Sequence, residues 1–480
     1  MPETNIDTTE LRFNPYHVVI FILALLVPVF VLPGLLDNVF NTPKTLLMLV
    51  GASVMLAIYA ITFLAGRPVP VSKVSTPKIL LFLILLNFFS FFYTRNYYYT
   101  VVASVMNITG LLIFYFVSLY VDGKKAFCLM MIIALSGLLV SVETWLQFFN
   151  IFILFKGVRP GAMLMGTIGN SNFLGGYLIF PLFAMVGLIF LLKGKCRLIP
   201  LGLFIFMLSA FLFSRARAGW MGFFLSLPIF LLVMKRIHKI SVAGYLRSHP
   251  KQVVAYVAVL SVLLMTLWSL APKRFQSMMQ FSHVTESETL RLRIQKYYRA
   301  SFWLFKQNPL FGTGLWSYRN GVYKAQAEIN RVDGNFFKNY PEPKPRRVHT
   351  DYLEILNDGG LIAAAALLLF FVMVMRHGWA VIRNEEIDSR DRVIAATAFC
   401  SLMAIMLAAF FFFPFRINST LFMTVLMMGL VEGIYLRNHA LIGATPAWKS
   451  EMRFLLIPIV LLLLTGLVWF GGIRPFVAEL

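Results

Sequence analysis

Long apolar stretches separated by short polar segments run along most of the chain. A transmembrane helix needs about 20 consecutive apolar residues to cross roughly 30 Å of hydrocarbon, and about thirteen stretches approach this length. They lie near residues 17–36, 45–65, 78–93, 100–121, 126–149, 172–192, 198–213, 219–234, 252–271, 360–376, 393–413, 417–436 and 454–473. The pattern predicts an all-α polytopic membrane protein with about 12–13 transmembrane helices. The stretches flanking residues 214–218 are expected as two helices, with one long helix as the alternative.

The basic residues between the stretches predict the orientation of the chain. Lys and Arg are retained in cytoplasmic loops. With the N-terminus inside, the inside segments contain 21 Lys and Arg residues, whereas the short outside segments contain eight. This bias predicts a cytoplasmic N-terminus and an outside location for residues 272–358. We therefore expect nine transmembrane helices in residues 1–271, a large outer loop at 272–358, and C-terminal transmembrane helices in 359–480.

The outer loop is expected to be partly helical. Residues 285–288 (Thr-Glu-Ser-Glu) have the spacing of a capping box, and apolar residues then recur at helical spacing. This predicts a helix near residues 286–307 that stops at Pro309, followed by a turn at 312–314 (Gly-Thr-Gly). Residues 330–348, with a Gly and three Pro, are expected to form an irregular loop.

Composition agrees with a membrane protein. Hydrophobic residues make up 59% of the chain and charged residues 13%, whereas soluble domains contain roughly 25% charged residues. A soluble enzyme, a disordered chain and a disulfide-stapled mini-domain are excluded. The net charge of +22 would suggest nucleic acid in a soluble protein, but its distribution over the loops points to a membrane, and no nucleic-acid partner is expected. The three cysteines are scattered and indicate neither a disulfide framework nor a metal cluster.

Familiar catalytic motifs are absent from the sequence. It contains no Walker-type phosphate loop, no His-Glu-x-x-His helix, no Gly-x-Ser-x-Gly elbow and no Asp-x-Asp pair. An enzyme of this sequence is therefore expected to work without a metal or another cofactor. The remaining candidates for functional residues are cations and polar groups at the outer membrane surface. Charged groups cost free energy close to the hydrocarbon, so their presence there suggests a function.

Two arginines interrupt the apolar pattern on the outer side. Arg215 and Arg217 lie in the segment 214–220 (Ser-Arg-Ala-Arg-Ala-Gly-Trp). A guanidinium can bind phosphate oxygens through two hydrogen bonds and keeps its charge when desolvated. The alternative is a tight turn whose arginines extend to the membrane surface without a function.

The predicted outer helix carries a further candidate cation. Arg293 borders its apolar face, beside an Ile and a Tyr, and is a candidate anion ligand. Lys296, Arg299 and Lys306 are expected to point away from that face into solvent. The spacing of this helix does not exclude a solvated basic face for Arg293 as well.

His349 and Tyr352 lie just before the tenth stretch. Positions 349, 352, 353 and 356 would share one helical face, which would direct the imidazole toward the bundle. A histidine titrates near neutrality and can take a proton from a hydroxyl, although a lone histidine on an apolar face is more often a core residue.

A Gly- and Asn-rich segment precedes the sixth stretch. Arg159 is followed by residues 166–177, which include Asn170 and Asn172. Amide side chains and backbone N–H groups at a helix N-terminus suit an anion or sugar hydroxyls. The alternative is helix capping by Ser171 or Asn172, with glycines for close helix packing.

Four short motifs occur in order along the chain. They are Gly-Thr-x-Gly-Asn-x-Asn-Phe-Leu-x-Gly-Tyr at 166–177, Arg-Ala-Gly-Trp-Met-Gly at 217–222, Arg293 with Pro-Leu-Phe-Gly-Thr-Gly at 309–314, and His-x9-Gly at 349–359. With the long outer loop, they make residues 100–435 resemble the bacterial O-antigen ligase/polymerase superfamily, and the chain is most similar to an O-antigen ligase.

The resemblance implies a GT-C-like, metal-independent and inverting glycosyltransferase in the bacterial inner membrane, with its active site facing the periplasm. Its donor would be a glycan on undecaprenyl diphosphate, and its acceptor lipid A-core or another glycan. Arg217 and Arg293 would hold the diphosphate, with Arg215 competing with Arg217 for the motif position, and His349 would be the catalytic base. Arg159, Asn170, Asn172 and Tyr352 are possible donor or glycan contacts.

Three alternatives remain at this point. A polysaccharide polymerase and a protein O-oligosaccharyltransferase share these motifs and differ chiefly in the acceptor. A transporter of lipid-linked oligosaccharides belongs to another class and would need charge networks inside the membrane. The predicted spans contain only Glu143 and Glu432 as acidic residues in their interiors, which argues against proton-coupled transport. A non-catalytic scaffold would leave the outer arginines unexplained.

Overall fold

A computed structural model describes residues 13–33, 38–94, 96–151, 164–239, 293–339, 347–445 and 464–474, with residue 154 and isolated positions within 250–269. In these ranges, nine helices are long and apolar enough to cross a membrane, and two shorter apolar helices accompany them. The expected all-α polytopic class is confirmed, and the protein is a multi-pass membrane protein. The stretch expected at 252–271 and most of that at 454–473 lie outside the described residues.

Within the described residues the helical bundle contains eleven helices, and each corresponds to one of the apolar stretches. They are α1 (Pro15–Val29), α2 (Thr42–Leu64), α3 (Thr76–Phe89, extended by the 3₁₀ turn Ser90–Phe92), α4 (Tyr97–Tyr120), α5 (Gly123–Phe148), α6 (Ser171–Leu191), α7 (Leu198–Phe213, preceded by the 3₁₀ turn Gly194–Arg197), α8 (Arg217–His238), α16 (Asp351–Arg383), α17 (Ser389–Ala408) and α18 (Asn418–Asn438). A π-helical turn, Trp469–Ile473, lies near the end of the chain. Residues 198–213 and 217–238 are two helices, separated by a tight turn.

Helices α6, α17 and α18 form the centre of the bundle. They are the most deeply buried of the nine spans, as expected for helices that are apolar on all sides. Glycines allow the helix backbones to approach: a Cβ at Gly219 of α8 would lie 3.1 Å from the Gly175 carbonyl of α6, and one at Gly222 would collide with the Ala404 carbonyl of α17. Small residues of this kind drive close helix packing in membranes.

Contacts between loops agree with the expected sides of the membrane. Among the segments expected inside, β1 (Pro70–Ser72) pairs antiparallel with β2 (Ile442–Ala444). Among the segments expected outside, Lys44 donates to the Thr167 carbonyl at 2.6 Å, and the Tyr93 hydroxyl donates to the Phe311 carbonyl at 2.7 Å. Segments expected on the same side therefore contact one another, and which of the two sides is outside stays a prediction from the charge bias.

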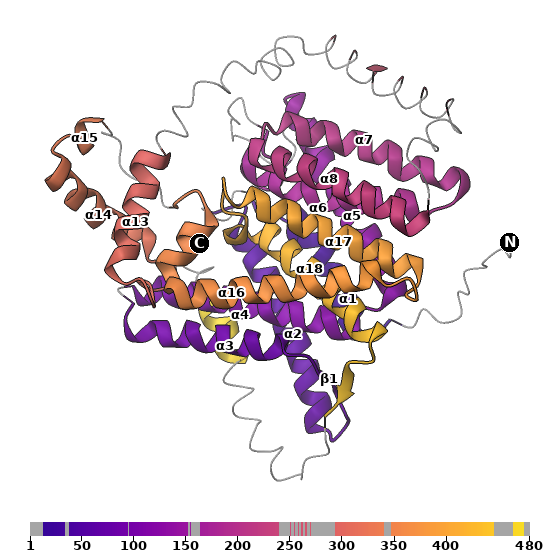
Figure 1. Ribbon diagram of the computed structural model, residues 1–480, viewed down its shortest axis with the longest axis horizontal. Helices are drawn as coiled ribbons and strands as arrows, with labels where there is room; N and C mark the ends of the chain where they lie inside the picture. Colours follow the sequence, from indigo (N-terminus) through magenta and orange to yellow (C-terminus); the bar gives the residue numbers. More distant parts are fainter. Residues whose placement is uncertain are drawn as a thin grey trace.

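Three helices of the outer loop form a small structure of their own. They are α13 (Arg299–Gln307), α14 (Tyr318–Asp333) and α15 (Phe336–Asn339), which lie together at one end of the bundle, on the left in Figure 1. Their shared apolar core includes Leu304, Tyr318, Val322, Ile329 and Phe336. Tyr318 is completely buried in it. The outer loop thus presents a packed platform beside the end of the bundle.

The outer loop differs from the sequence prediction in two respects. Residues 330–333 and 336–339 are helical rather than irregular, because Ile329 and Phe336 pack into the core of the platform. For the helix predicted near 286–307, the structure describes residues 293–307. They form a π-helix (Arg293–Tyr298) that continues directly into α13. The expectation that Lys296 points into solvent is wrong, since this side chain lies over the Tyr297 ring and only 3% of the residue is exposed.

Candidate functional site at the outer end of the bundle

A break in α16 anchors the outer loop to the bundle. Gly360 has a φ of 65°, so the backbone hydrogen bonds of this helix are interrupted there. Segment 309–314 supplies the missing partners. The Pro309 carbonyl accepts from the Leu361 N–H at 2.8 Å, and the Thr313 N–H donates to the Asn357 carbonyl at 2.7 Å. The Pro- and Gly-containing motif therefore holds the outer helices over the start of α16.

His349 lies just before α16 in an unusual backbone conformation. Its φ of 68° is in the left-handed region that favours glycine. Because the helix begins at Asp351, the prediction that His349 shares a helical face with Tyr352 is wrong. The imidazole instead packs between the rings of Tyr297, stacked at 5.4 Å, and Phe413, edge-on at 5.4 Å.

The surroundings of His349 keep its imidazole neutral. Burial, together with the positive charge of Arg293, lowers the pKa of His349 to about 4, against a smaller opposing effect of Glu354. The ring nitrogens are therefore uncharged at neutral pH, the state in which an imidazole can accept a proton. Arg293 lies one helical turn before Tyr297, whose ring stacks on the imidazole.

Arg293 links the outer helices to the loop after α17. Its Nη1 donates to the Phe411 carbonyl at 2.8 Å. Burial lowers the pKa of Arg293, and the positive charge of Arg217 contributes in the same direction. The positive charge of Arg217 therefore acts on the Arg293 guanidinium. Such a group of cations favours an anion between or beside them.

The turn between α7 and α8 presents Arg215 and Arg217 differently. Arg215 has a φ of 55° within the turn, and burial lowers the pKa of its half-buried guanidinium. The Ser214 hydroxyl accepts from the Ala216 N–H at 3.3 Å and shapes this turn. Arg217 is exposed at the first residue of α8. Arg217, the position preferred by motif spacing, is thus the more exposed of the two arginines.

The Gly- and Asn-rich loop approaches the same place from α6. Asn170 is the N-cap of α6, and its side chain accepts from the Asn172 N–H at 2.9 Å. The alternative interpretation, a helix cap, is thus present in this segment, but the capping residue is Asn170 and not Ser171 or Asn172. Both asparagines are exposed. Phe173, one residue later, packs edge-on against Phe413 at 5.3 Å, so this loop adjoins the ring that contacts His349.

Two of the other candidates are not part of this cluster as described. The Tyr352 hydroxyl donates to the Met406 carbonyl at 2.8 Å, and its ring packs on Phe410 at 4.4 Å. Arg159 lies outside the described residues.

Arg299 and Lys306 are exposed, and Arg299 forms an ion pair with Asp333.

Comparison with known proteins identifies the region that carries most of this cluster. Residues 202–368 match the family model described as O-antigen ligase. The chain is therefore similar to the O-antigen ligase family over these residues. The matched region runs from α7 to the broken helix α16 and contains Arg215, Arg217, Arg293 and His349. A comparison with curated proteins finds no match.

The outer end of the bundle also contains an ion-pair network that sequence reasoning missed. Arg416, in the 3₁₀ turn Pro414–Arg416 (η6), pairs with three carboxylates of α16: Asp358 at 2.8 Å, Asp351 at 3.5 Å and Glu354 at 3.6 Å. Arg347 pairs with Glu354 at 2.8 Å. Burial alone would lower the pKa of Arg416, but the three carboxylates outweigh it and raise the pKa. The spacing of Asp351, Glu354 and Asp358 along one helical face was the available signal.

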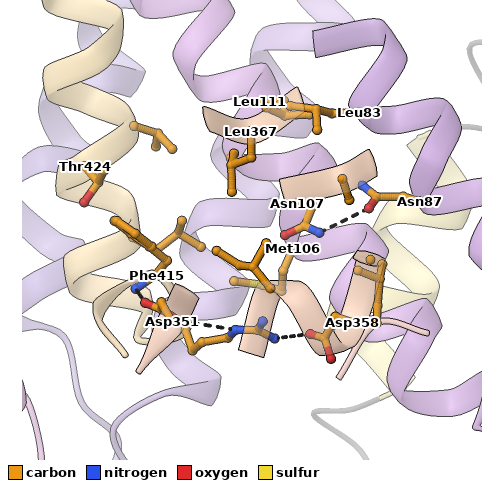
Figure 2. Close-up of a pocket in the computed structure, with 18 of the residues that line it drawn as sticks. Leu83, Asn87, Met106, Asn107, Leu111, Asp351, Asp358, Leu367, Phe415 and Thr424 are labelled. Carbon is orange, nitrogen blue, oxygen red and sulfur yellow. Dashed lines mark hydrogen bonds and ion pairs between the residues drawn. The ribbon is translucent and has the colours of Figure 1, made fainter. Parts of the chain in front are cut away.

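This network closes one end of a cavity of about 190 Å³ between α3, α4, α16 and α18. Figure 2 shows Asp351 and Asp358 at this end, with Met106 and Leu367 among the apolar residues above them. Both carboxylates pair with Arg416. The three carboxylates are thus engaged by arginines. Within the described ranges, no group of three or more His, Cys, Asp or Glu side chains is arranged to hold a metal ion.

Proposed function

We propose that this protein is a membrane glycosyltransferase of the O-antigen ligase type, which transfers a glycan from undecaprenyl diphosphate to lipid A-core at the periplasmic face of the inner membrane. The proposal rests on one observation above all. Arg293 bonds to the Phe411 carbonyl beside Phe413, and His349 packs on both Phe413 and Tyr297 of the helix that begins with Arg293, so a cation and an imidazole from separate segments adjoin the same group of rings. The family match supports an O-antigen ligase or polymerase type of activity in general.

The chemistry follows from the two charged groups and the neutral imidazole. Bond cleavage at the anomeric carbon leaves negative charge on the lipid diphosphate, which Arg217 and Arg293 stabilise. His349 takes the proton of the acceptor hydroxyl as its oxygen attacks the anomeric carbon from the opposite side, so the configuration inverts. The exposed amides of Asn170 and Asn172 hold sugar hydroxyls, and the Tyr352 ring offers a surface for a sugar. In this proposal, Arg159 and Arg215 make additional contacts to the lipid-linked donor.

The proposed transfer needs no metal ion, and the nearby carboxylates are already paired with arginines. A hard divalent cation needs carboxylate or carbonyl oxygens as ligands. Asp351, Glu354 and Asp358 instead contact Arg416 and Arg347. In this proposal the guanidinium groups of Arg217 and Arg293 take the part that a divalent cation plays in other glycosyl transfers.

The decisive experiment is transfer in vitro with purified components. Purified protein receives undecaprenyl diphosphate-glycan and, in separate reactions, lipid A-core, a second lipid-linked glycan or an acceptor protein, each with and without EDTA. We expect product with lipid A-core, at the same rate in EDTA. Product with only the second glycan would identify a polymerase, and product with only the protein a protein glycosyltransferase. A loss of transfer in EDTA that Mg²⁺ or Mn²⁺ restores would contradict the metal-independent mechanism.

A further inference from the structure

The backbone at His349 needs support from its neighbours. A non-glycine residue rarely adopts a φ of 68°, and such a conformation persists only where the surrounding structure imposes it. Contacts hold the chain on both sides. Before His349, the Val348 N–H donates to Glu354 Oε2 at 3.2 Å. After it, the Thr350 hydroxyl and the Asp351 N–H both donate to the Ala409 carbonyl at 3.2 Å.

Glu354 is an unusual group to find in this place. Only 1% of the residue is exposed, and a buried carboxylate is costly unless it is paired and hydrogen-bonded. Arg347 Nη1 donates to Oε1 at 2.8 Å, and Arg416 lies 3.6 Å from the same oxygen. The two arginines therefore hold the carboxylate so that its second oxygen meets the Val348 N–H.

The same network positions the opposite wall of the histidine site. Asp351, which pairs with Arg416, accepts from the Phe415 N–H at 2.8 Å. The segment just before Phe415 supplies Phe413, whose ring packs on His349, and the Phe411 carbonyl, which holds Arg293. One ion-pair network thus contacts both the chain that carries the imidazole and the segment that packs against it.

From these contacts we propose that Glu354 is a positioning residue for glycan transfer. Held by Arg347 and Arg416, it keeps residue 348 in place and thereby holds the His349 imidazole between Tyr297 and Phe413, where it meets the acceptor hydroxyl. Glu354 contacts the backbone one residue before His349 and takes no part in proton transfer itself. This inference rests on the function proposed above.

The test is a double-mutant cycle on transfer rate between Glu354→Gln and His349→Ala. Glutamine has the same size but lacks the charge that orders both arginines. We expect Glu354→Gln alone to lower kcat about 10- to 100-fold, the effect of a small misplacement of a reacting group, with donor binding unchanged. In the His349→Ala protein, the same substitution should have no further effect on the residual rate, because no imidazole is left to position.

Glu432→Gln is the matched control. Like Glu354, Glu432 lies in a membrane helix and is only 1% exposed. It lies toward the other end of the bundle, where it bonds to His377 and accepts from the Thr76 hydroxyl. Its transfer rate should stay at the wild-type level. If Glu354→Gln does not reach the membrane, Arg347→Gln addresses the same contact from outside the membrane helix and should show the same dependence on His349.

The outcomes separate the inference from the proposed function. Wild-type rate in Glu354→Gln, or a full additional loss in the His349→Ala protein, would overturn the positioning role while leaving His349 as the base. Undiminished transfer by folded His349→Ala would instead overturn the mechanism itself. Absence of transfer by the wild-type protein from any lipid diphosphate-glycan would overturn the proposed function.

Discussion

At the scale of single residues, the hydrogen-bonding geometry of Arg293 matters as much as its charge. One edge of its guanidinium is engaged by the Phe411 carbonyl. A guanidinium has five N–H donors in a planar fork, so other donors remain for phosphate oxygens, whereas a lysine ammonium offers a compact point charge. Arg293 can therefore fix the loop after α17 and bind an anion at the same time.

We expect Arg293→Lys to lower transfer about 100-fold, the usual cost of removing one donor that stabilises developing negative charge. Initial rates would be measured at equal membrane levels of each variant. Arg299→Lys is the control, because it makes the same change six residues further along the same segment, at an exposed ion pair with Asp333. It should transfer at the wild-type rate. Full activity of Arg293→Lys would reduce this arginine to a general electrostatic role.

At the scale of secondary structure, the break at Gly360 divides α16 into two parts with different roles. Beyond Gly360 the helix is an apolar membrane span, and before it the helix carries the carboxylates that pair with Arg416. The freed N–H groups of Leu361 and Ile362 bond to the carbonyls of Pro309 and Leu310. The break therefore couples the position of the outer helices to that of the bundle.

Gly360→Ala should destabilise the protein by about 1–3 kcal/mol, the cost of a residue held in a left-handed or similarly rare conformation. An added Cβ would also collide with the Leu310 carbonyl. Thermal unfolding in detergent measures the effect. Gly202→Ala in α7 is the control, since a Cβ there meets open space, and alanine favours a helix over glycine by about 1 kcal/mol. Equal stability of the two variants would contradict a structural role for the break.

At the scale of the whole molecule, the side of the membrane on which the cluster lies decides its substrates. The polar segments gather in two groups, and the charge bias assigns the group with His349 to the outside. A site on that side meets lipid-linked glycans that have already crossed the membrane.

Cysteine labelling from outside tests this orientation. The three natural cysteines are first replaced, because Cys196 is exposed and would react. In this background an impermeant maleimide should modify Asn335→Cys and spare Gly244→Cys. Asn335 lies between α14 and α15 of the outer platform, and Gly244 lies in a segment with five Lys and Arg residues at 235–251. Both variants should react after the membrane is permeabilised. Modification of position 244 alone would reverse the orientation.

The sequence by itself determined the class of the protein and most helix boundaries, because a membrane helix needs about 20 apolar residues whatever its neighbours are. The tight turn at Ser214–Ala216 and the turn around Gly312 and Gly314, both with positive φ, were also readable, since glycine and polar residues interrupt helices locally. Helices α14 and α15 were not, because their few apolar residues are buried against α13 rather than against the bundle.

Which residues lie near one another depends on how the helices pack. Segment 309–314 docks onto α16 at Gly360, and Tyr297, on the helix that begins with Arg293, stacks on His349. Arg416 meets Glu354 and Asp358 across more than fifty residues of chain. Hydrophobic periodicity records which side of a helix is buried, but it carries no information about the partner that covers it. Long-range ion pairs and a strained histidine backbone therefore become visible only once the helices are packed.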